Sequence, residues 1–288
     1  MRKRLRRALA ELLSAEDLVG VYSAFDIVGD IAIIKLLTNT STVRARIVAE
    51  TIMNRNKKVK AVFVQEGAVT GNFRLRSLAH VAGENRTHTF HKESGCFFAV
   101  DVEKCYFSPK LSGERTRIAY LIQPGETVVN MFAGVGCFSV LIAKRQPTAK
   151  VYSVDINPTA VDFMRENVRL NRVYGKVIPL LGDAKEIIQN RLLHCADRVL
   201  MPLPEKAFEY LAFAVSALKP SGGWIHVHTF EHATKTEDPL EKFRLKMAEH
   251  ISSLGVDFEV RFSRIVRPVG PNWHQLVADI QVKGLGKF

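Results

Sequence analysis

Residues 128–138 read VVNMFAGVGCF, and this stretch decides the fold class. Its first half is an apolar run of strand length that ends in a glycine-rich turn at Gly134 and Gly136. Apolar residues at helical spacing follow over residues 138–142. A strand that turns through glycines directly into a helix predicts an α/β sheet that binds a ligand at its carboxyl edge.

From residue 128 onward, apolar runs alternate with amphipathic helical patterns. Right-handed crossovers between such runs predict a doubly wound, mostly parallel sheet. The last two runs have no helix between them and are joined through residues 268–271, so we expect an antiparallel hairpin at the sheet edge, an ending typical of methyltransferase sheets. The expected strands are residues 128–132, 150–156, 176–181, 198–201, 224–229, 258–264 and 275–282.

The first third of the chain predicts a smaller α/β unit. Ser41 is a suitable N-cap for its helix. The polar stretch 82–88 indicates that a domain boundary follows shortly after it. We therefore expect a small domain over residues 1–92 and a larger domain over residues 93–288. The expected elements of the small domain are strands at residues 25–30 and 31–36 and a helix at residues 40–54.

The charge of the chain favours a polyanionic partner. It has 41 Lys and Arg against 29 Asp and Glu, a formal net charge of +12. Such an excess favours nucleic acid, although a basic balance also serves solubility alone. The basic cluster within residues 1–7 either contacts phosphates or is solvated.

Several classes of protein are disfavoured by the sequence. No apolar run approaches the roughly 18 residues of a membrane span, and the basic N-terminus lacks the apolar core of a secretory signal. We therefore expect a cytoplasmic protein with no membrane partner, and nothing implies a protein partner. The cysteines form no CxxC pair, so we expect neither a zinc site nor a disulfide framework. They are Cys96, Cys105, Cys137 and Cys195.

Acidic residues follow the next two strands where a nucleoside would bind. Asp155 ends its strand about 20 residues past Gly134, where a carboxylate accepts both ribose hydroxyl hydrogens of an adenosine ligand. Its alternative role is to assist the helix start at residues 157–158. Asp183 is placed to meet an adenine amino group, or else to cap a helix. Ser139 replaces the third glycine of the dinucleotide fingerprint, which disfavours a nicotinamide cofactor.

The motifs together resemble the archaeal and eukaryal tRNA (guanine-37-N1)-methyltransferase family. The resemblance covers most of the chain, and its most specific part is YFSPKLSGER at residues 106–115. The related aminocarboxypropyl transferases of wyosine synthesis usually carry a glycine-asparagine element in place of Ser108 and Pro109. The other matching segments are residues 72–74, 82–86, 130–136, 154–158 and 182–183.

This resemblance implies a Rossmann-like class I methyltransferase and an enzyme that methylates N1 of guanosine 37 in the anticodon loop of tRNA. Its cofactor is S-adenosylmethionine. Glu114 would be the general base at N1 and Arg74 the donor to O6, roles that the chemistry requires because N1 carries a proton. The alternatives are an ion pair of Glu114 with Arg115 or Arg117, and a solvated strand position for Arg74.

The resemblance also implies the remaining site residues, and no metal. Lys110 stands where relatives often carry arginine, which keeps the charge but loses the bidentate geometry. We expect cofactor contacts from Tyr106, Lys110, Phe132, Ala133, Gly134, Val135, Gly136, Asp155, Ile156 and Asp183. We expect substrate contacts from Arg115, Pro202, Leu203 and Pro204.

Two departures from the family pattern keep other functions open. Asn130 replaces an aspartate, and the sequence MPLP at residues 201–204 replaces asparagine-leucine-proline. Pro202 removes a side-chain amide and a backbone donor from this loop. A loop without these groups would accommodate a larger base. The alternative to guanine methylation is therefore methyl or aminocarboxypropyl transfer to a wyosine precursor at the same tRNA position. A non-catalytic RNA-binding module is a further one.

Overall fold

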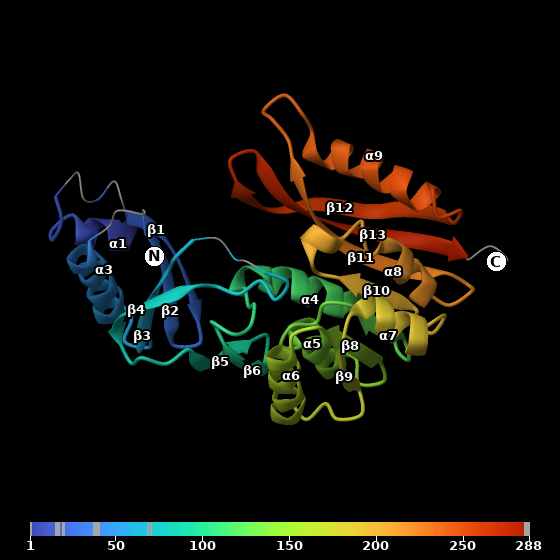
Figure 1. Cartoon of the computed structure of the whole chain (residues 1–288), viewed down its shortest axis with the longest axis horizontal. Helices are drawn as coiled ribbons and strands as arrows, with labels where there is room; N and C mark the ends of the chain where they lie inside the picture. The colour runs from blue at the N-terminus through green and yellow to red at the C-terminus, as the bar shows by residue number, and fades with distance from the viewer. Residues whose placement is uncertain are drawn as a thin grey trace. The chain divides into compact units, whose positions relative to one another are not determined.

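The computed structural model describes residues 2–14, 18, 21–36, 41–67, 69 and 71–284, and it divides into two compact units (Figure 1). The first unit is Met1–Gly113 and the second is Glu114–Phe288. Strand β5 (His88–Glu93) pairs with β6 (Cys96–Asp101) in an antiparallel hairpin. Because this hairpin crosses the boundary that we expected after residue 92, residues 93–113 group with the first unit.

The first unit is built on a four-stranded sheet in the order β1-β2-β3-β4. Strands β2 and β3 are parallel, and the outer pairs are antiparallel. Helices α1 (Arg2–Leu9) and α3 (Thr42–Arg55) contribute Leu5, Val48 and Ile52 to the core of this unit. The strands are β1 (Val21–Val28), β2 (Ile31–Leu36), β3 (Ala61–Gln65) and β4 (Leu78–Gly83).

The elements expected in the small unit are confirmed. Ser41 caps α3, and its hydroxyl accepts a hydrogen bond from the Arg44 backbone N–H at 3.3 Å. Residues 31–34 are fully buried because β2 is an inner strand that packs against the helices. After β6, a short 3-10 helix η1 (Pro109–Leu111) leads into α4 (Ser112–Leu121).

The second unit contains a seven-stranded sheet in the order β12-β13-β11-β10-β7-β8-β9. Strands β7 to β11 run parallel, and β13 is antiparallel to both β11 and β12. The doubly wound fold with a terminal antiparallel hairpin is therefore confirmed. The strands are β7 (Thr127–Asn130), β8 (Lys150–Asp155), β9 (Val177–Leu181), β10 (Arg198–Met201), β11 (Gly223–His232), β12 (Asp257–Gly270) and β13 (Trp273–Gly284).

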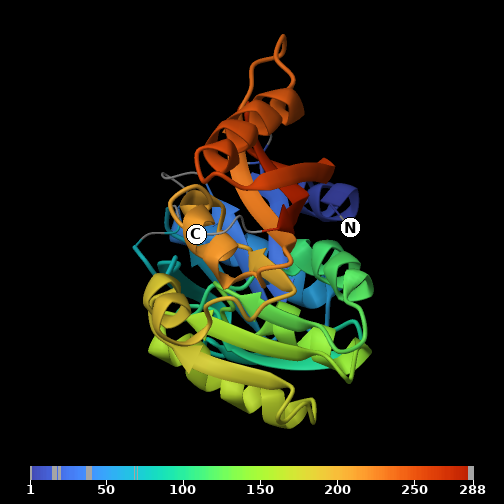
Figure 2. The same cartoon turned by 90° about the vertical axis from the view of Figure 1, so that its right-hand side faces the viewer.

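The terminal hairpin is longer than the sequence indicated. Its strands, drawn in orange and red in Figure 1 and Figure 2, extend beyond the expected ends. Pro268 and Gly270 pair within the ladder, so the turn lies at residues 271–272 instead of 268–271. Pro268 is tolerated because β12 is the edge strand.

The two faces of the large sheet differ in polarity. One face packs Val129, Val199 and Ile225 against α7, α8 and α9 in an apolar core. Because strand residues alternate between faces, the opposite face carries buried polar residues such as Asn130 and His226. The helices of the unit after α4 are α5 (Cys137–Arg145), α6 (Pro158–Leu170), α7 (Ala184–Arg191), α8 (Leu211–Ala217) and α9 (Pro239–Ser252), with a 3-10 helix η2 (Pro204–Lys206).

Within the described ranges, no helix combines the length and the apolar character needed to cross a membrane.

Two glycines with positive φ allow a direct stability test. A Cβ at Gly222 (φ +89°) would lie 2.1 Å from the Val282 carbonyl oxygen of β13, whereas a Cβ at Gly255 (φ +69°) meets nothing within 4 Å. We expect Gly255→Ala to lower the free energy of unfolding by about 1–2 kcal/mol through left-handed strain alone. Gly222→Ala should cost roughly a further 1–3 kcal/mol, because backbone atoms must move.

Urea unfolding of the two variants and the parent chain measures this difference. Equal destabilisation by both substitutions would contradict the close packing of Gly222 against β13.

Candidate active site

The glycine turn after β7 is bonded directly to the acid at the end of β8. Gly134 and Gly136 both have positive φ, at 55° and 88°. A Cβ at Gly136 would lie 2.7 Å from Cγ of Met164, so this position is also tight. The Gly134 backbone N–H donates to Oδ2 of Asp155 at 2.6 Å. Ala133 and Val135, the neighbours of Gly134 in this turn, are both buried.

Asp155 serves both elements that flank it. Its Oδ1 accepts a hydrogen bond from the Asn157 backbone N–H at 2.9 Å, so the helix-start role is present. Burial raises the pKa of the Asp155 carboxyl, and the backbone hydrogen bonds partly oppose that rise. Ile156, which follows it, is an exposed apolar residue at 43%. A carboxylate beside an open apolar surface is the combination that an adenosine ribose and base require.

Asp183 is the N-cap of α7, as its alternative role proposed. It accepts hydrogen bonds from the Lys185 backbone N–H at 2.9 Å and from the Tyr210 hydroxyl at 3.0 Å. The Tyr210 ring packs edge-on against Phe132, with centroids 5.1 Å apart. Tyr210 therefore connects Phe132, which follows β7, to Asp183, which follows β9. Tyr210 carried no sequence signal, because it lies on a loop before α8 with no motif around it.

The loop after β10 is half-buried at its start and buried where η2 begins. Pro202 and Leu203 are half-buried, and Pro204 is buried and begins η2. This loop follows the carboxyl end of β10, and ligands bind at that edge in parallel α/β sheets.

Glu114 is buried and ion-paired. Only 2% of the residue is exposed. Arg117 donates to Oε1 at 2.6 Å and 3.0 Å and to Oε2 at 3.1 Å, and Arg264 of β12 donates to Oε2 at 2.6 Å. The pairing with Arg117 is one of the alternatives left open by the sequence. Arg115, beside Glu114 on α4, is itself 3% exposed.

Arg117 continues into a chain of charged side chains, joined through one histidine, across the polar face of the sheet. Burial lowers the pKa of that histidine, His226, so its imidazole is neutral at neutral pH. Arg117 donates to Oδ1 of Asp279 at 2.9 Å, and Asp279 also accepts from Nδ1 of His226 at 2.6 Å. Nε2 of His226 lies 2.8 Å from Nη1 of Arg198. We call this set the buried ion-pair chain; its members are Glu114, Arg117, Asp279, His226, Arg198 and Glu126, the last at 2.8 Å from Arg198.

The buried ion-pair chain sets the charge of its carboxylates. Burial would raise the pKa of Glu114, but the hydrogen bonds and charge of Arg117 and the hydrogen bond from Arg264 hold it below its usual value. The pKa of Asp279 is likewise lowered: burial opposes the shift, and Arg117 and His226 dominate. Both carboxylates are therefore ionised at neutral pH. Beyond the Glu114–Arg117 pair on α4, no sequence spacing indicated this chain, because Asp279, His226 and Arg198 lie on separate strands and Glu126 precedes β7.

His228 lies beside the start of α5. It is 2% exposed, and its ring packs edge-on to Phe138 with centroids 6.0 Å apart. Burial lowers its pKa to about 4, and the charges of Glu114 and Asp279 only partly offset the effect of burial. The imidazole is therefore neutral at neutral pH.

In the first unit, Arg74 and Tyr106 are brought together. The Arg74 guanidinium lies over the Tyr106 ring, 4.4 Å from its centroid. Arg74 occupies a turn with φ +54°, so the solvated strand position considered from the sequence is wrong. Lys110, expected near the cofactor, makes an ion pair with Asp26 of β1 at 2.7 Å.

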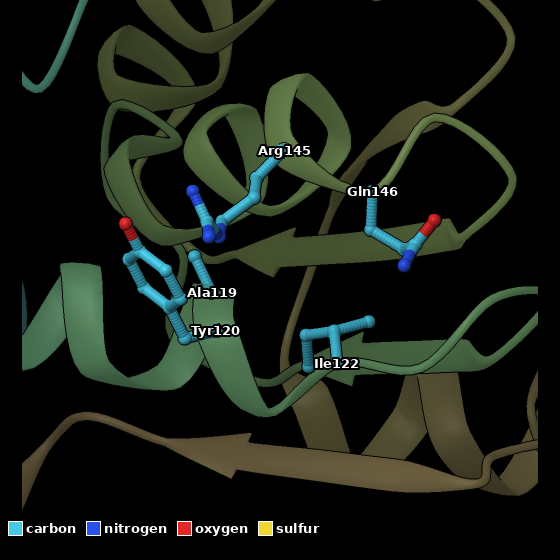
Figure 3. Close-up of a pocket in the computed structure, with 5 residues that line it drawn as sticks. All are labelled: Ala119, Tyr120, Ile122, Arg145 and Gln146. Carbon is cyan, nitrogen blue, oxygen red and sulfur yellow. The ribbon is translucent and has the colours of Figure 1, made fainter.

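A pocket of about 370 Å³ in the second unit lies away from these residues (Figure 3). It is lined by Tyr120 and Ile122 near the end of α4, and by Arg145, the last residue of α5, and Gln146 after it. Because α5 begins at the carboxyl end of β7 and runs back, its last residue marks the amino edge of the sheet. Arg145 lies over the Tyr120 ring there, 3.0 Å from its centroid. This pocket is distinct from the glycine-turn site.

The fold and the carboxyl edge define a class I methyltransferase: a glycine turn after the first strand of the sheet, an acid after the second, and an antiparallel final strand. The family follows from the comparisons. The model of the TRM5/TYW2 methyltransferase domain matches residues 89–254, and that of the TYW2 N-terminal domain matches residues 5–87. The chain belongs to the TRM5/TYW2 methyltransferase family, which confirms the resemblance found in the sequence.

Similar proteins include both guanine-N1 methyltransferases and a methyltransferase of 4-demethylwyosine. The chain is 39% identical to the tRNA (guanine(37)-N(1))-methyltransferase Trm5b of Pyrococcus abyssi, over 90% of this chain and 75% of the relative. It is 37% identical to the tRNA 4-demethylwyosine(37)-methyltransferase Taw21 of Saccharolobus solfataricus, over 92% and 96%. A solved complex of aTrm5 and tRNALeu is 33% identical with a TM-score of 0.83, covering 96% of this chain and 78% of that one.

The buried His228 predicts a pH dependence of stability. Its pKa of about 4 lies below the value of about 6.5 in an unfolded chain. Between these values the unfolded chain binds a proton that the folded chain does not, so the free energy of unfolding falls as the pH is lowered, by up to about 1.4 kcal/mol per pH unit. We expect His228→Leu to remove this contribution, measured by urea unfolding from about pH 7 to pH 4.

The matched control is His250→Leu, which removes an exposed histidine. An unchanged pH slope in His228→Leu would show that the buried imidazole does not exclude a proton.

Proposed function

We propose that the chain transfers a methyl group from S-adenosylmethionine to N1 of guanosine 37 in the anticodon loop of tRNA, in the cytoplasm. The observation that carries the proposal is Glu114, a buried carboxylate held ionised by arginine. Membership of the TRM5/TYW2 family supports it, as does the named activity of the Trm5b relatives. The solved complex of a relative with tRNALeu supports tRNA as the partner.

The residues at the carboxyl edge fit the cofactor. Gly134 and Gly136 leave room for close approach of a ligand, and the Asp155 carboxylate is held in place by two backbone N–H groups with lone pairs left for a ribose. Phe132 and Ile156 offer apolar surface for the adenine, and the Asp183 carboxylate is within the same edge. When bound, the sulfonium supplies an electrophilic methyl group, so the protein needs no nucleophile of its own.

The chemistry at the acceptor falls to Glu114 and Arg74. N1 of guanine carries a proton, so Glu114 accepts it as N1 attacks the methyl group, and Arg74 stabilises the negative charge that develops on O6. A guanine in a stacked loop hides N1, so the nucleotide must leave the stack to react. Arg115 and the Pro202–Pro204 loop are then the proposed contacts to the flipped base.

Glu114 can accept a proton only if one of its oxygens is released. Arg117 is anchored by Asp279 as well as by Glu114, whereas Arg264 is more exposed, with 38% of its side chain accessible against 22% for Arg117. We propose that Arg264 leaves Oε2 when the RNA binds and that Arg117 stays to orient the carboxylate. A base held by one fixed arginine keeps its geometry and regains a free lone pair.

A second candidate is methyl transfer to a tRNA that carries 4-demethylwyosine at position 37. The observation in its favour is the match to Taw21, which extends over 96% of that relative. Pro202 and Leu203, at the half-buried start of the loop after β10, would accommodate a larger tricyclic base. The two candidates share the cofactor site and differ only in the acceptor.

We expect Glu114→Gln to slow single-turnover methylation of unmodified tRNA by about 10² to 10⁴, the usual contribution of a positioned base. The amide still accepts a hydrogen bond from Arg117, so cofactor and tRNA affinities should change little. Raising the pH should partly restore the rate, because solvent then deprotonates N1. Transfer of labelled methyl from S-adenosylmethionine is the measurement.

Glu231→Gln provides the control, since Glu231 is also a buried, ion-paired carboxylate but is not a member of the buried ion-pair chain. A wild-type rate for Glu114→Gln between about pH 6 and pH 9 would remove Glu114 from the mechanism.

The product identifies the acceptor. We expect nucleoside mass spectrometry of treated tRNA to detect N1-methylguanosine, and a tRNA with adenosine at position 37 to take up no methyl group. The second candidate predicts a methylated tricyclic nucleoside when the tRNA carries 4-demethylwyosine. Methyl incorporation at any other position of the tRNA would contradict both.

A further inference from the structure

The β5–β6 hairpin of the first unit presents aromatic side chains to solvent. Phe90 is 53% exposed and Phe97 is 45% exposed. Phe90 pairs with Ala99 and Lys92 pairs with Phe97 in the register of the hairpin. Residues opposite each other, and alternate residues along a strand, share one face, so Phe90, Lys92 and Phe97 lie on the same face. The residues of the opposite face, including Thr89 and Phe98, are buried.

Basic side chains accompany these rings. The Lys92 ammonium lies 5.1 Å from the centroid of the Phe97 ring. An open cavity of about 640 Å³ in the first unit is lined by Lys58, Phe90 and Lys92. Arg86 also lines it but is neutralised by two hydrogen bonds to Asp30. Among the residues that the structure describes, neither Lys58 nor Lys92 has a carboxylate partner.

Exposed rings next to uncompensated ammonium groups match the chemistry of a nucleotide. A base stacks on an aromatic face, and the adjoining phosphate is attracted to the lysines. A protein partner would instead need acidic groups for the lysines and an apolar surface for both rings. The net charge of +12 on the chain favours the polyanion.

We propose that the face formed by Lys58, Phe90, Lys92 and Phe97 binds an unpaired nucleotide of the tRNA other than the target guanosine. The base stacks on Phe90 and Phe97, and the phosphates contact Lys58 and Lys92. This inference rests on the proposed function, because its occupant is the tRNA substrate. Such a contact contributes affinity and holds the RNA in register, but takes no part in the chemistry.

Two leucine substitutions separate stacking from simple apolar contact. Phe90→Leu combined with Phe97→Leu keeps apolar bulk and removes both π faces. We expect the dissociation constant for tRNA to rise about tenfold, in line with the loss of base stacking. The single-turnover rate at saturating tRNA and the affinity for S-adenosylmethionine should not change. Phe90→Tyr with Phe97→Tyr should retain wild-type binding, because tyrosine restores the stacking surface.

Charge reversal tests the phosphate contact. We expect Lys92→Glu to weaken tRNA binding and to reduce by about one the slope of log affinity against log salt concentration. The matched control is Lys150→Glu, because Lys150 is also exposed and lies 5.1 Å from an aromatic ring, that of Tyr152, in the second unit. The control should have the smaller effect on both affinity and slope.

Three results are decisive. If the leucine variant binds tRNA as the wild type does, and Lys92→Glu acts no more strongly than Lys150→Glu, the proposed face is wrong while the proposed function stands. If the tyrosine variant binds as weakly as the leucine variant, stacking is not the interaction. If the wild-type protein neither binds nor methylates any tRNA, the proposed function fails and this inference fails with it.

Discussion

The bridge made by Arg117 between Glu114 and Asp279 is the contact on which the second unit depends. Burying three charges is costly unless each is paired, and removing one partner leaves the others uncompensated in a low-dielectric interior. Arg117 satisfies both carboxylates and thereby joins α4 to β13, while His226 and Arg198 carry the pairing on to β11 and β10. The orientation of Glu114 is therefore fixed by its link to the sheet, as the proposed role of a positioned base requires.

The sequence predicted the parts of the site whose residues follow directly after strands that are successive along the chain. Gly134 and Asp155 each follow a strand, and strands that are neighbours in a parallel sheet bring such residues to one edge. The fold class followed from the same alternation of strands and helices. Arg117 and Asp279 are 162 residues apart and belong to elements of different type, so no periodicity links them. Long-range charge pairing of this kind is visible only once the sheet order is known.

Several residues expected at the site also have structural partners in the chain. Asp183 caps α7, and Lys110 pairs with Asp26. Glu114 pairs with two arginines. The sequence offered the cap role of Asp183 and the pairing of Glu114 with Arg117 as alternatives, whereas the Lys110–Asp26 and Glu114–Arg264 pairs come from the structure. A buried polar group needs such a partner whenever no ligand is bound. A structural contact of this kind is compatible with the proposed functional role, provided that the group can exchange its internal partner for a ligand.

The pairing of Arg117 with Asp279 also imposes an order on folding during synthesis. Glu114 and Arg117 leave the ribosome well before β13, so helix α4 is made before Asp279, the partner of Arg117 on β13. Because chains emerge from the N-terminal side, the parallel strands β7 to β11 are complete before β13 is made, so Asp279 becomes available to Arg117 only after β11 and β12. Until then the Arg117–Asp279 pair that orients Glu114 cannot form.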